Sequence, residues 1–234
     1  MFTRQNAVSK DPNLEWVKHL LEACWHGLCF PEGMKLAPGK IAIACVWLTA
    51  AAAGAWKLYQ YELTPGSASV TSERWPAGSQ IKLAHDGPTL LFFAHPQCPC
   101  TRASVEELNR LMARANGTIE CRALFFQPPD YPAEWSHGSL WNSAAAIPGV
   151  TAQVDPDGEE ARRFGAETSG YVVLYSRDGR LLFRGGITAA RGHAGDNPGA
   201  DAIAAIANGE AAARHETPVF GCSLLGQCPA SAKN

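Results

Sequence analysis

Two cysteines separated by one proline, Cys98 and Cys100, are the residues whose types and spacing point most directly to chemistry. They follow the apolar run 89–94 and precede a segment of helical periodicity that opens at Arg102. The backbone N–H groups at a helix start carry partial positive charge, which favours a thiolate over a thiol. Because the thiolate is both a nucleophile and a soft-metal ligand, the sequence predicts a redox or metal-handling site here.

The close spacing of the pair limits its chemistry. Cα atoms two residues apart in a helical turn fall within the range that a disulfide needs, but the ring is small and Pro99 restricts its adjustment. A strained disulfide is more easily reduced and hence more oxidising. Two neighbouring thiolates also suit a soft ion such as Cu(I), with His95 as a third ligand or as a proton partner; otherwise His95 is a solvated loop residue.

The glycine-rich segment 185–197 is the second candidate for chemistry. It contains Arg191, His193 and Asp196, which could supply a cation, a base or a ligand. Its glycines are too scattered for a phosphate-binding fingerprint. The alternative is a surface loop without a chemical role.

The composition excludes one class of partner. The chain has 234 residues and a formal net charge of -2, so no basic surface is available to neutralise the phosphates of a nucleic acid. No cofactor other than copper is suggested. Nothing in the sequence indicates the oligomeric state.

The eight cysteines do not form one disulfide framework. Cys121 lies in a predicted central strand and is expected to be a small buried apolar residue. Cys222 and Cys228 lie in a C-terminal tail. They either pair across their short loop, or Cys222 returns as a partner for Cys98 and Cys100.

Residues 40–58 are predicted to form a single transmembrane helix. Lys40 and Lys57 bracket this alanine-rich stretch, and their long side chains can reach the interfaces of the membrane. Trp56, Tyr59 and Tyr61 suit the headgroup region. A buried core helix and a cleaved signal peptide are the alternatives.

The remaining elements predict an α/β domain. Asp-Gly between two apolar runs is a strong hairpin signal near the end of the domain. The helix after the cysteines should bury one face, formed by Val105, Leu108, Leu111, Met112 and Ala115. An entry strand is expected around 80–83. The predicted order is strand 89–94, helix 102–115, strand 118–126, helix 135–146, strand 150–154, helix 159–164, strand 171–175, strand 180–183 and helix 200–207.

This order, together with the segment 92–100, resembles the thioredoxin-like superfamily. The resemblance is to its membrane-tethered, extracytoplasmic branch, which includes cytochrome c-maturation thioredoxins, and the string His-Pro-x-Cys-Pro-Cys-Thr-Arg-Ala-Ser is similar to RedB-like bacterial membrane proteins. It implies a central mixed sheet flanked by helices, with Cys98 and Cys100 as catalytic residues. By analogy, the chain would be a single-pass protein of the bacterial inner (cytoplasmic) membrane with its main domain outside the cytoplasm.

Two positions differ from the family pattern. Pro99 and Cys100 match the proline and the second cysteine of the family's Cys-x-x-Cys motif, while Gln97 stands in place of the first and Cys98 comes one position later. Where the family has a cis-proline facing the thiols, this chain has 168–170, ending in Gly170. His95, Pro99, Gly170 and His193 are the expected supporting residues, and the hairpin should bring His193 to the thiol-bearing side of the sheet.

Three functions fit these observations. The first is a membrane-anchored thiol–disulfide oxidoreductase that acts on an extracytoplasmic protein partner through Cys98 and Cys100. In it, Cys98 is expected to be the more exposed, attacking thiol, and Cys100 the buried resolving thiol. The second is a copper- or soft-metal-binding or delivery module using Cys98, Cys100 and His95. The third is a redox-inactive thioredoxin-fold binding protein.

The expected domain organisation follows from these segments. An amphipathic segment covers residues 1–39 and the transmembrane helix 40–58. A tether follows at 59–78, and the thioredoxin-like domain covers 79–210. A cysteine-containing tail forms 211–234.

Overall fold

The computed structural model describes residues 38–225. The expected amphipathic segment up to residue 37, as well as Cys228, lies outside these residues. Helix α2 covers Pro38–Leu63, 26 residues, with no buried side chain. Among the described residues it is the one helix long and apolar enough to cross a membrane. Lys57 therefore lies inside the helix rather than at its end, because the helix continues six residues further.

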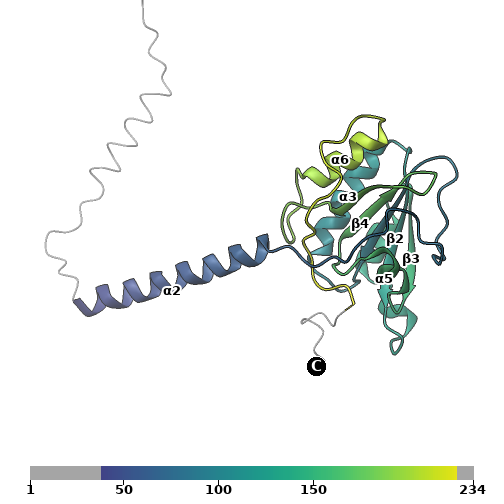
Figure 1. The fold of residues 1–234 in the computed structure, drawn as a ribbon. Coiled ribbons are helices and arrows are strands. Elements are labelled where there is room, and N and C mark those ends of the chain that lie inside the picture. Colours follow the sequence, from purple (N-terminus) through teal and green to yellow (C-terminus); the bar gives the residue numbers. More distant parts are fainter. Residues whose placement is uncertain (1–37, 226–234) are drawn as a thin grey trace, which may run out of the picture. The chain divides into compact units, whose positions relative to one another are not determined.

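Five strands form one mixed sheet in the order β3-β2-β1-β4-β5. β1 pairs in parallel with β2, and β2 with β3, whereas β4 runs antiparallel to both β1 and β5. This is the thioredoxin-like topology expected from the sequence (Figure 1). The strands are β1 (Thr89–Ala94), β2 (Glu120–Gln127), β3 (Val150–Pro156), β4 (Tyr171–Tyr175) and β5 (Leu181–Gly186).

Helices cover both faces of the sheet because its central strands are apolar on both sides. Every residue of β1 is buried. Leu90 and Phe92 face the core shared with α3 (Thr101–Ala115), α4 (Ser139–Ala145) and α6 (Pro198–Ala207). Leu91 and Phe93 face the opposite core, to which α5 (Glu159–Phe164) contributes. β1 therefore contributes side chains to both cores, and it ends directly before the cysteine segment.

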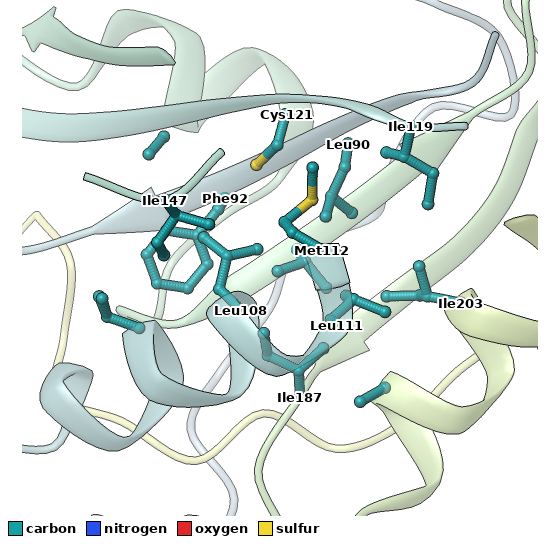
Figure 2. Packing of buried hydrophobic residues seen from close by; sticks show 14 of the residues in the cluster. Leu90, Phe92, Leu108, Leu111, Met112, Ile119, Cys121, Ile147, Ile187 and Ile203 are labelled. Carbon is teal, nitrogen blue, oxygen red and sulfur yellow. The ribbon is translucent and has the colours of Figure 1, made fainter. Parts of the chain in front are cut away.

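The predicted inner face of α3 is confirmed. Val105, Leu108, Leu111, Met112 and Ala115 are all buried. Figure 2 shows Leu108, Leu111 and Met112 packed beside Leu90 and Phe92. The helix ends at Asn116, which adopts a left-handed conformation with φ of 48°.

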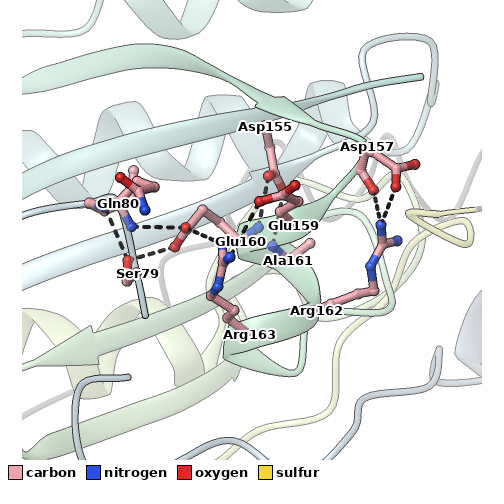
Figure 3. A network of polar contacts seen from close by, with 10 residues as sticks. Ser79, Gln80, Asp155, Asp157, Glu159, Glu160, Ala161, Arg162 and Arg163 are labelled. Atoms are coloured by element: carbon pink, nitrogen blue, oxygen red, sulfur yellow. Dashed lines mark hydrogen bonds and ion pairs between the residues drawn. The ribbon is translucent and has the colours of Figure 1, made fainter. Parts of the chain in front are cut away.

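A buried carboxylate network organises the second face of the sheet (Figure 3). Asp155, at the end of β3, accepts hydrogen bonds of 2.9 Å from the backbone N–H groups of Glu160 and Ala161. These N–H groups lie at the start of α5, where the helix itself provides no acceptor. Glu160 in turn accepts from the Ser79 hydroxyl at 2.6 Å and the Gln80 N–H at 3.0 Å. Burial raises the pKa of Asp155.

Two predicted elements differ from the structure. No strand forms at 80–83; the Gln80 N–H is instead bonded to the Glu160 side chain. The predicted helix 135–146 is divided into a short 3-10 helix, Ala133–Trp135, and α4, because Gly138 adopts an extended conformation at the α4 N-cap. The remaining predicted strands and helices are present, with ends shifted by a few residues.

Candidate functional site

Cys98 and Cys100 lie in a turn that joins β1 to α3. The Cys98 N–H donates to the His95 carbonyl at 3.1 Å, and the Thr101 N–H donates to the Cys98 carbonyl at 3.2 Å. Cys100 is the N-cap residue of α3. Pro99 is exposed between the two cysteines. Both thiols are therefore held at the positive end of the helix, as the sequence predicts.

A third thiol joins this pair from the C-terminal tail. The sulfur atoms of Cys98, Cys100 and Cys222 all lie within 4.8 Å of one another. The Ser169 N–H donates to the Cys222 carbonyl at 2.9 Å, which fixes the tail beside the segment 168–170. Three thiols at this spacing could bind a soft ion such as Cu(I). Cys222 thus takes the place in the cluster that the sequence suggested for His95.

The expected order of exposure within the pair is wrong. Cys98 is fully buried, whereas Cys100 is partly exposed. Position along the chain placed Cys98 nearer the loop, but the tail residue Cys222 contacts its side chain. Cys98 is therefore the shielded thiol, and Cys100 and Cys222 are the sulfurs nearer to solvent.

Hydrogen bonds favour the ionised form of Cys98. The thiol of Cys222 has the largest effect, and the hydroxyl of Thr101 and the backbone N–H groups of both residues add to it, so that the pKa of Cys98 is lowered to about 4 despite its burial. The pKa of Cys100 is raised, first by burial and then by the negative charge of Cys98. At neutral pH the favoured state is therefore a Cys98 thiolate that accepts hydrogen bonds from Cys222 and Thr101.

Ser169 orients these donors. The backbone N–H of His95 can only donate, so the Ser169 hydroxyl accepts from it at 2.7 Å. The Ser169 proton is then available to Thr101, whose hydroxyl oxygen lies 2.6 Å away, and the Thr101 proton is left to Cys98. The sequence does not identify Ser169 or Thr101 as site residues, because hydroxyl side chains at these positions carry no motif.

His95 is buried next to the cysteines but outside the three-thiol cluster. Its ring lies 6.0 Å from the Phe126 ring and 5.4 Å from the Trp135 ring, measured between centroids. Burial lowers its pKa, and the nearby Cys98 opposes that effect. Its Nδ1 atom accepts from the Gln97 N–H at 3.2 Å. His95 is therefore a neutral, buried histidine rather than a solvated loop residue.

The glycine-rich loop reaches the thiols through Arg191 rather than His193. Arg191 lies close enough to Cys100 to lower its pKa, and its guanidinium also donates to the carbonyl of Gly221. His193 is exposed, with Nδ1 2.9 Å from the carbonyl oxygen of Arg191. The carboxylate of Glu107 on α3 anchors the same loop, accepting from the Gly195 N–H at 2.8 Å.

Gly170 and Cys121 are packed closely by the fold, as is typical of residues with a structural role. Gly170 has a φ of +93°, and an added Cβ would lie 2.8 Å from the Ser104 hydroxyl oxygen. Its N–H donates to the Phe93 carbonyl at 2.8 Å, which holds the segment 168–170 against β1. Cys121 is fully buried in β2, and burial raises its pKa, as expected for a small apolar residue.

The reduced chain should become more stable as the pH rises from about 4 toward 9. The pKa of Cys98 is lowered from 9.0 to about 4 on folding, so between these values the unfolded chain binds a proton that the folded chain does not. The stabilisation is complete above the pKa of Cys98 in the unfolded chain. It is lost as the pH falls through the pKa of Cys98 in the folded chain. Thermal unfolding of the reduced chain across this range, compared with Cys98→Ser, measures the effect; equal slopes for both proteins would contradict it.

Comparison with known proteins supports the fold. No protein-family model and no curated protein sequence matches the chain. A hypothetical protein from Sinorhizobium meliloti 1021 is 20% identical, with a TM-score of 0.50 over 70% of this chain and 95% of that one. An uncharacterized conserved protein from Geobacillus kaustophilus is 18% identical, with a TM-score of 0.51 over 70% and 93%. A secreted Mycobacterium tuberculosis disulfide oxidoreductase is 22% identical over 42% of this chain and 67% of its own, with a TM-score of 0.34.

Proposed function

We propose that this protein is a membrane-anchored thiol–disulfide oxidoreductase whose redox-active thiols include Cys98 and Cys100. The observation that supports it best is the set of donors around Cys98, namely the Cys222 thiol, the Thr101 hydroxyl and two backbone N–H groups. Disulfide exchange requires a thiolate, and a thiol of low pKa is also a good leaving group. A structural thiol such as Cys121 has the opposite surroundings.

Anchoring and location complete the proposal. Helix α2 would serve as a single span of the bacterial inner membrane, with the thioredoxin-like domain on the extracytoplasmic side, where protein disulfides persist. A protein thiol or disulfide would be the substrate class. We also propose that the chain belongs to the RedB-like branch, because the sequence around Cys98 is similar to that of RedB-like proteins.

Redox titration of the full chain in detergent tests the function. The protein is equilibrated in glutathione buffers from reducing to oxidising, alkylated, and its thiols are assigned by mass spectrometry. We expect a reversible two-electron transition that includes Cys98 and is lost in Cys98→Ser. Cys45→Ser, on the exposed surface of α2, is the matched control and should titrate as the wild type. A Cys98 that stays a thiol in every buffer would contradict the proposal.

Soft-metal binding is a second candidate, favoured by the convergence of three sulfur atoms within 4.8 Å. Cu(I) would take Cys98, Cys100 and Cys222 as its thiolate ligands. In the same reduced preparation, this function would appear as stoichiometric copper that a chelator removes. A chain that neither binds copper nor changes its thiol count would instead be a redox-inactive binding protein.

A further inference from the structure

The C-terminal tail, residues 215–225, is built into the domain rather than appended to it. The Thr217 N–H donates to the Arg184 carbonyl at 3.2 Å, and the Leu224 N–H donates to the Glu167 carbonyl at 2.8 Å. Val219 and Leu224 are buried in the core on the α5 side of the sheet. These contacts hold the tail on both sides of Cys222.

The tail places Cys222 directly against Cys98. Its carbonyl is bonded to the Ser169 N–H at 2.9 Å, and its thiol and its N–H both contribute hydrogen bonds to Cys98. Ser169 also binds Thr101, which is the other donor to Cys98. Backbone hydrogen bonds therefore hold Cys222 in place, as they hold the turn of Cys98, although Cys222 lies more than 120 residues away in the chain.

Burial decides which sulfur a partner can reach. Cys98 is fully buried, whereas Cys222 is partly exposed. An incoming protein disulfide or thiol is bulky, so it meets Cys222 before Cys98 while the tail is in place. Cys98 can still react inside the protein, because the two sulfurs are close.

We propose that Cys222 is a third catalytic thiol of this site, which exchanges with the protein partner and forms a disulfide with the buried Cys98. This inference rests on the proposed function. Cys222 attacks a partner disulfide as its proton passes to the neighbouring Cys98 thiolate. A Cys222–partner bond forms, and one partner sulfur leaves as a thiolate and takes up that proton from Cys98. The Cys98 thiolate then attacks Cys222, so that the Cys98–Cys222 bond forms and the second partner sulfur leaves. Two electrons and one proton pass to the partner, which ends as one thiol and one thiolate.

Cys222 is a better partner for Cys98 than Cys100 is. A Cys98–Cys100 disulfide closes a small ring around Pro99, whose φ is fixed, and such rings are strained. Cys222 comes from a separate segment, so its disulfide with Cys98 carries no such constraint. Arg191, which is bonded to the Gly221 carbonyl, adds a positive charge beside these sulfurs.

Oxidised glutathione provides a defined probe for the full chain in detergent. The wild type should release two glutathione molecules and form a Cys98–Cys222 disulfide, identified by mass spectrometry of non-reduced peptides. Cys98→Ser should accumulate a glutathione adduct on Cys222, because the resolving thiolate is absent. Cys222→Ser should react at least about tenfold more slowly, because Cys98 is buried and the pKa of the remaining exposed thiol, Cys100, is raised.

Cys45→Ser, on the exposed surface of α2, is the matched control and should form the Cys98–Cys222 disulfide as the wild type does. Disulfide mapping of the wild type needs no variant, so the test does not depend on the folding of Cys222→Ser. A Cys98–Cys100 disulfide in the oxidised wild type, or an unchanged rate in Cys222→Ser, would overturn this inference and leave the proposed function intact. Failure of every thiol to react would refute both.

Discussion

Replacing Gly221 with alanine is expected to lift the tail from the thiols and expose Cys98. A Cβ at this position would overlap the backbone carbonyl oxygen of Ser169 and lie 3.1 Å from the Thr168 Cγ2 atom. Because the carbonyl oxygen of Ser169 belongs to the backbone, no side-chain rotation can relieve its overlap with the new Cβ, and the tail must move. The hydrogen bond from the Ser169 N–H to the Cys222 carbonyl would then be lost.

The expected result is a change in Cys98 chemistry with a smaller change in stability. Cys98 loses its Cys222 donors, so its pKa rises, while an alkylating reagent gains access to it. We expect alkylation of Cys98 to accelerate by about tenfold or more, and the free energy of unfolding to fall by about 1–3 kcal/mol. Timed alkylation with peptide mass spectrometry measures the first, and chemical denaturation the second.

Gly138→Ala is the matched control for this change. Gly138 has no atom within 4 Å of an added Cβ, and its φ of −98° is open to any residue. This variant should alkylate at the wild-type rate. Equal rates for Gly221→Ala and the wild type would show that the tail does not shield Cys98.

Truncation of Phe92 to alanine is expected to cost about 3–5 kcal/mol of stability. Phe92 is fully buried in the central strand, beside Leu108 and Ile147 (Figure 2). A domain is typically stable by only about 5–15 kcal/mol, so this variant should be close to unfolding. Urea denaturation followed by circular dichroism gives the value.

The consequence for the site follows from chain continuity. β1 leads directly into the turn that carries Cys98, so loss of β1 packing should also release the thiols. Val70→Ala, at a side chain that is 92% exposed, is the control and should change stability by less than about 0.5 kcal/mol. A loss below about 1 kcal/mol for Phe92→Ala would mean that this core tolerates the cavity.

Local patterns were sufficient to predict the core of this fold. The continuous apolar run predicts β1 and the helical periodicity predicts the inner face of α3, because each buries a continuous surface. The segment 80–83 was wrongly predicted as a strand, since a short alternating pattern does not reveal whether a neighbouring strand exists to pair with it. Strand formation is decided by partners distant in the sequence.

The sequence predicts the local part of the site and leaves the return of Cys222 as one of two alternatives. The helix-start position of Cys98 and Cys100 follows from neighbouring residues, whereas the return of Cys222 depends on backbone hydrogen bonds to Ser169 and Glu167. Such bonds leave no side-chain pattern in the sequence. The exposure of Cys98 was predicted wrongly for the same reason, because a segment far along the chain contacts it.

The return of the tail to the start of α3 has a topological consequence. A bond between Cys98 and Cys222 would close a covalent ring of roughly 125 residues that encloses every helix and strand from α3 to α6, while α2 stays outside. Closing a ring of this size removes chain entropy worth about 5 kcal/mol from the unfolded state. Oxidation would therefore close the domain into a covalent loop with α2 outside it, so the redox state of the thiol pair would set the domain's resistance to unfolding.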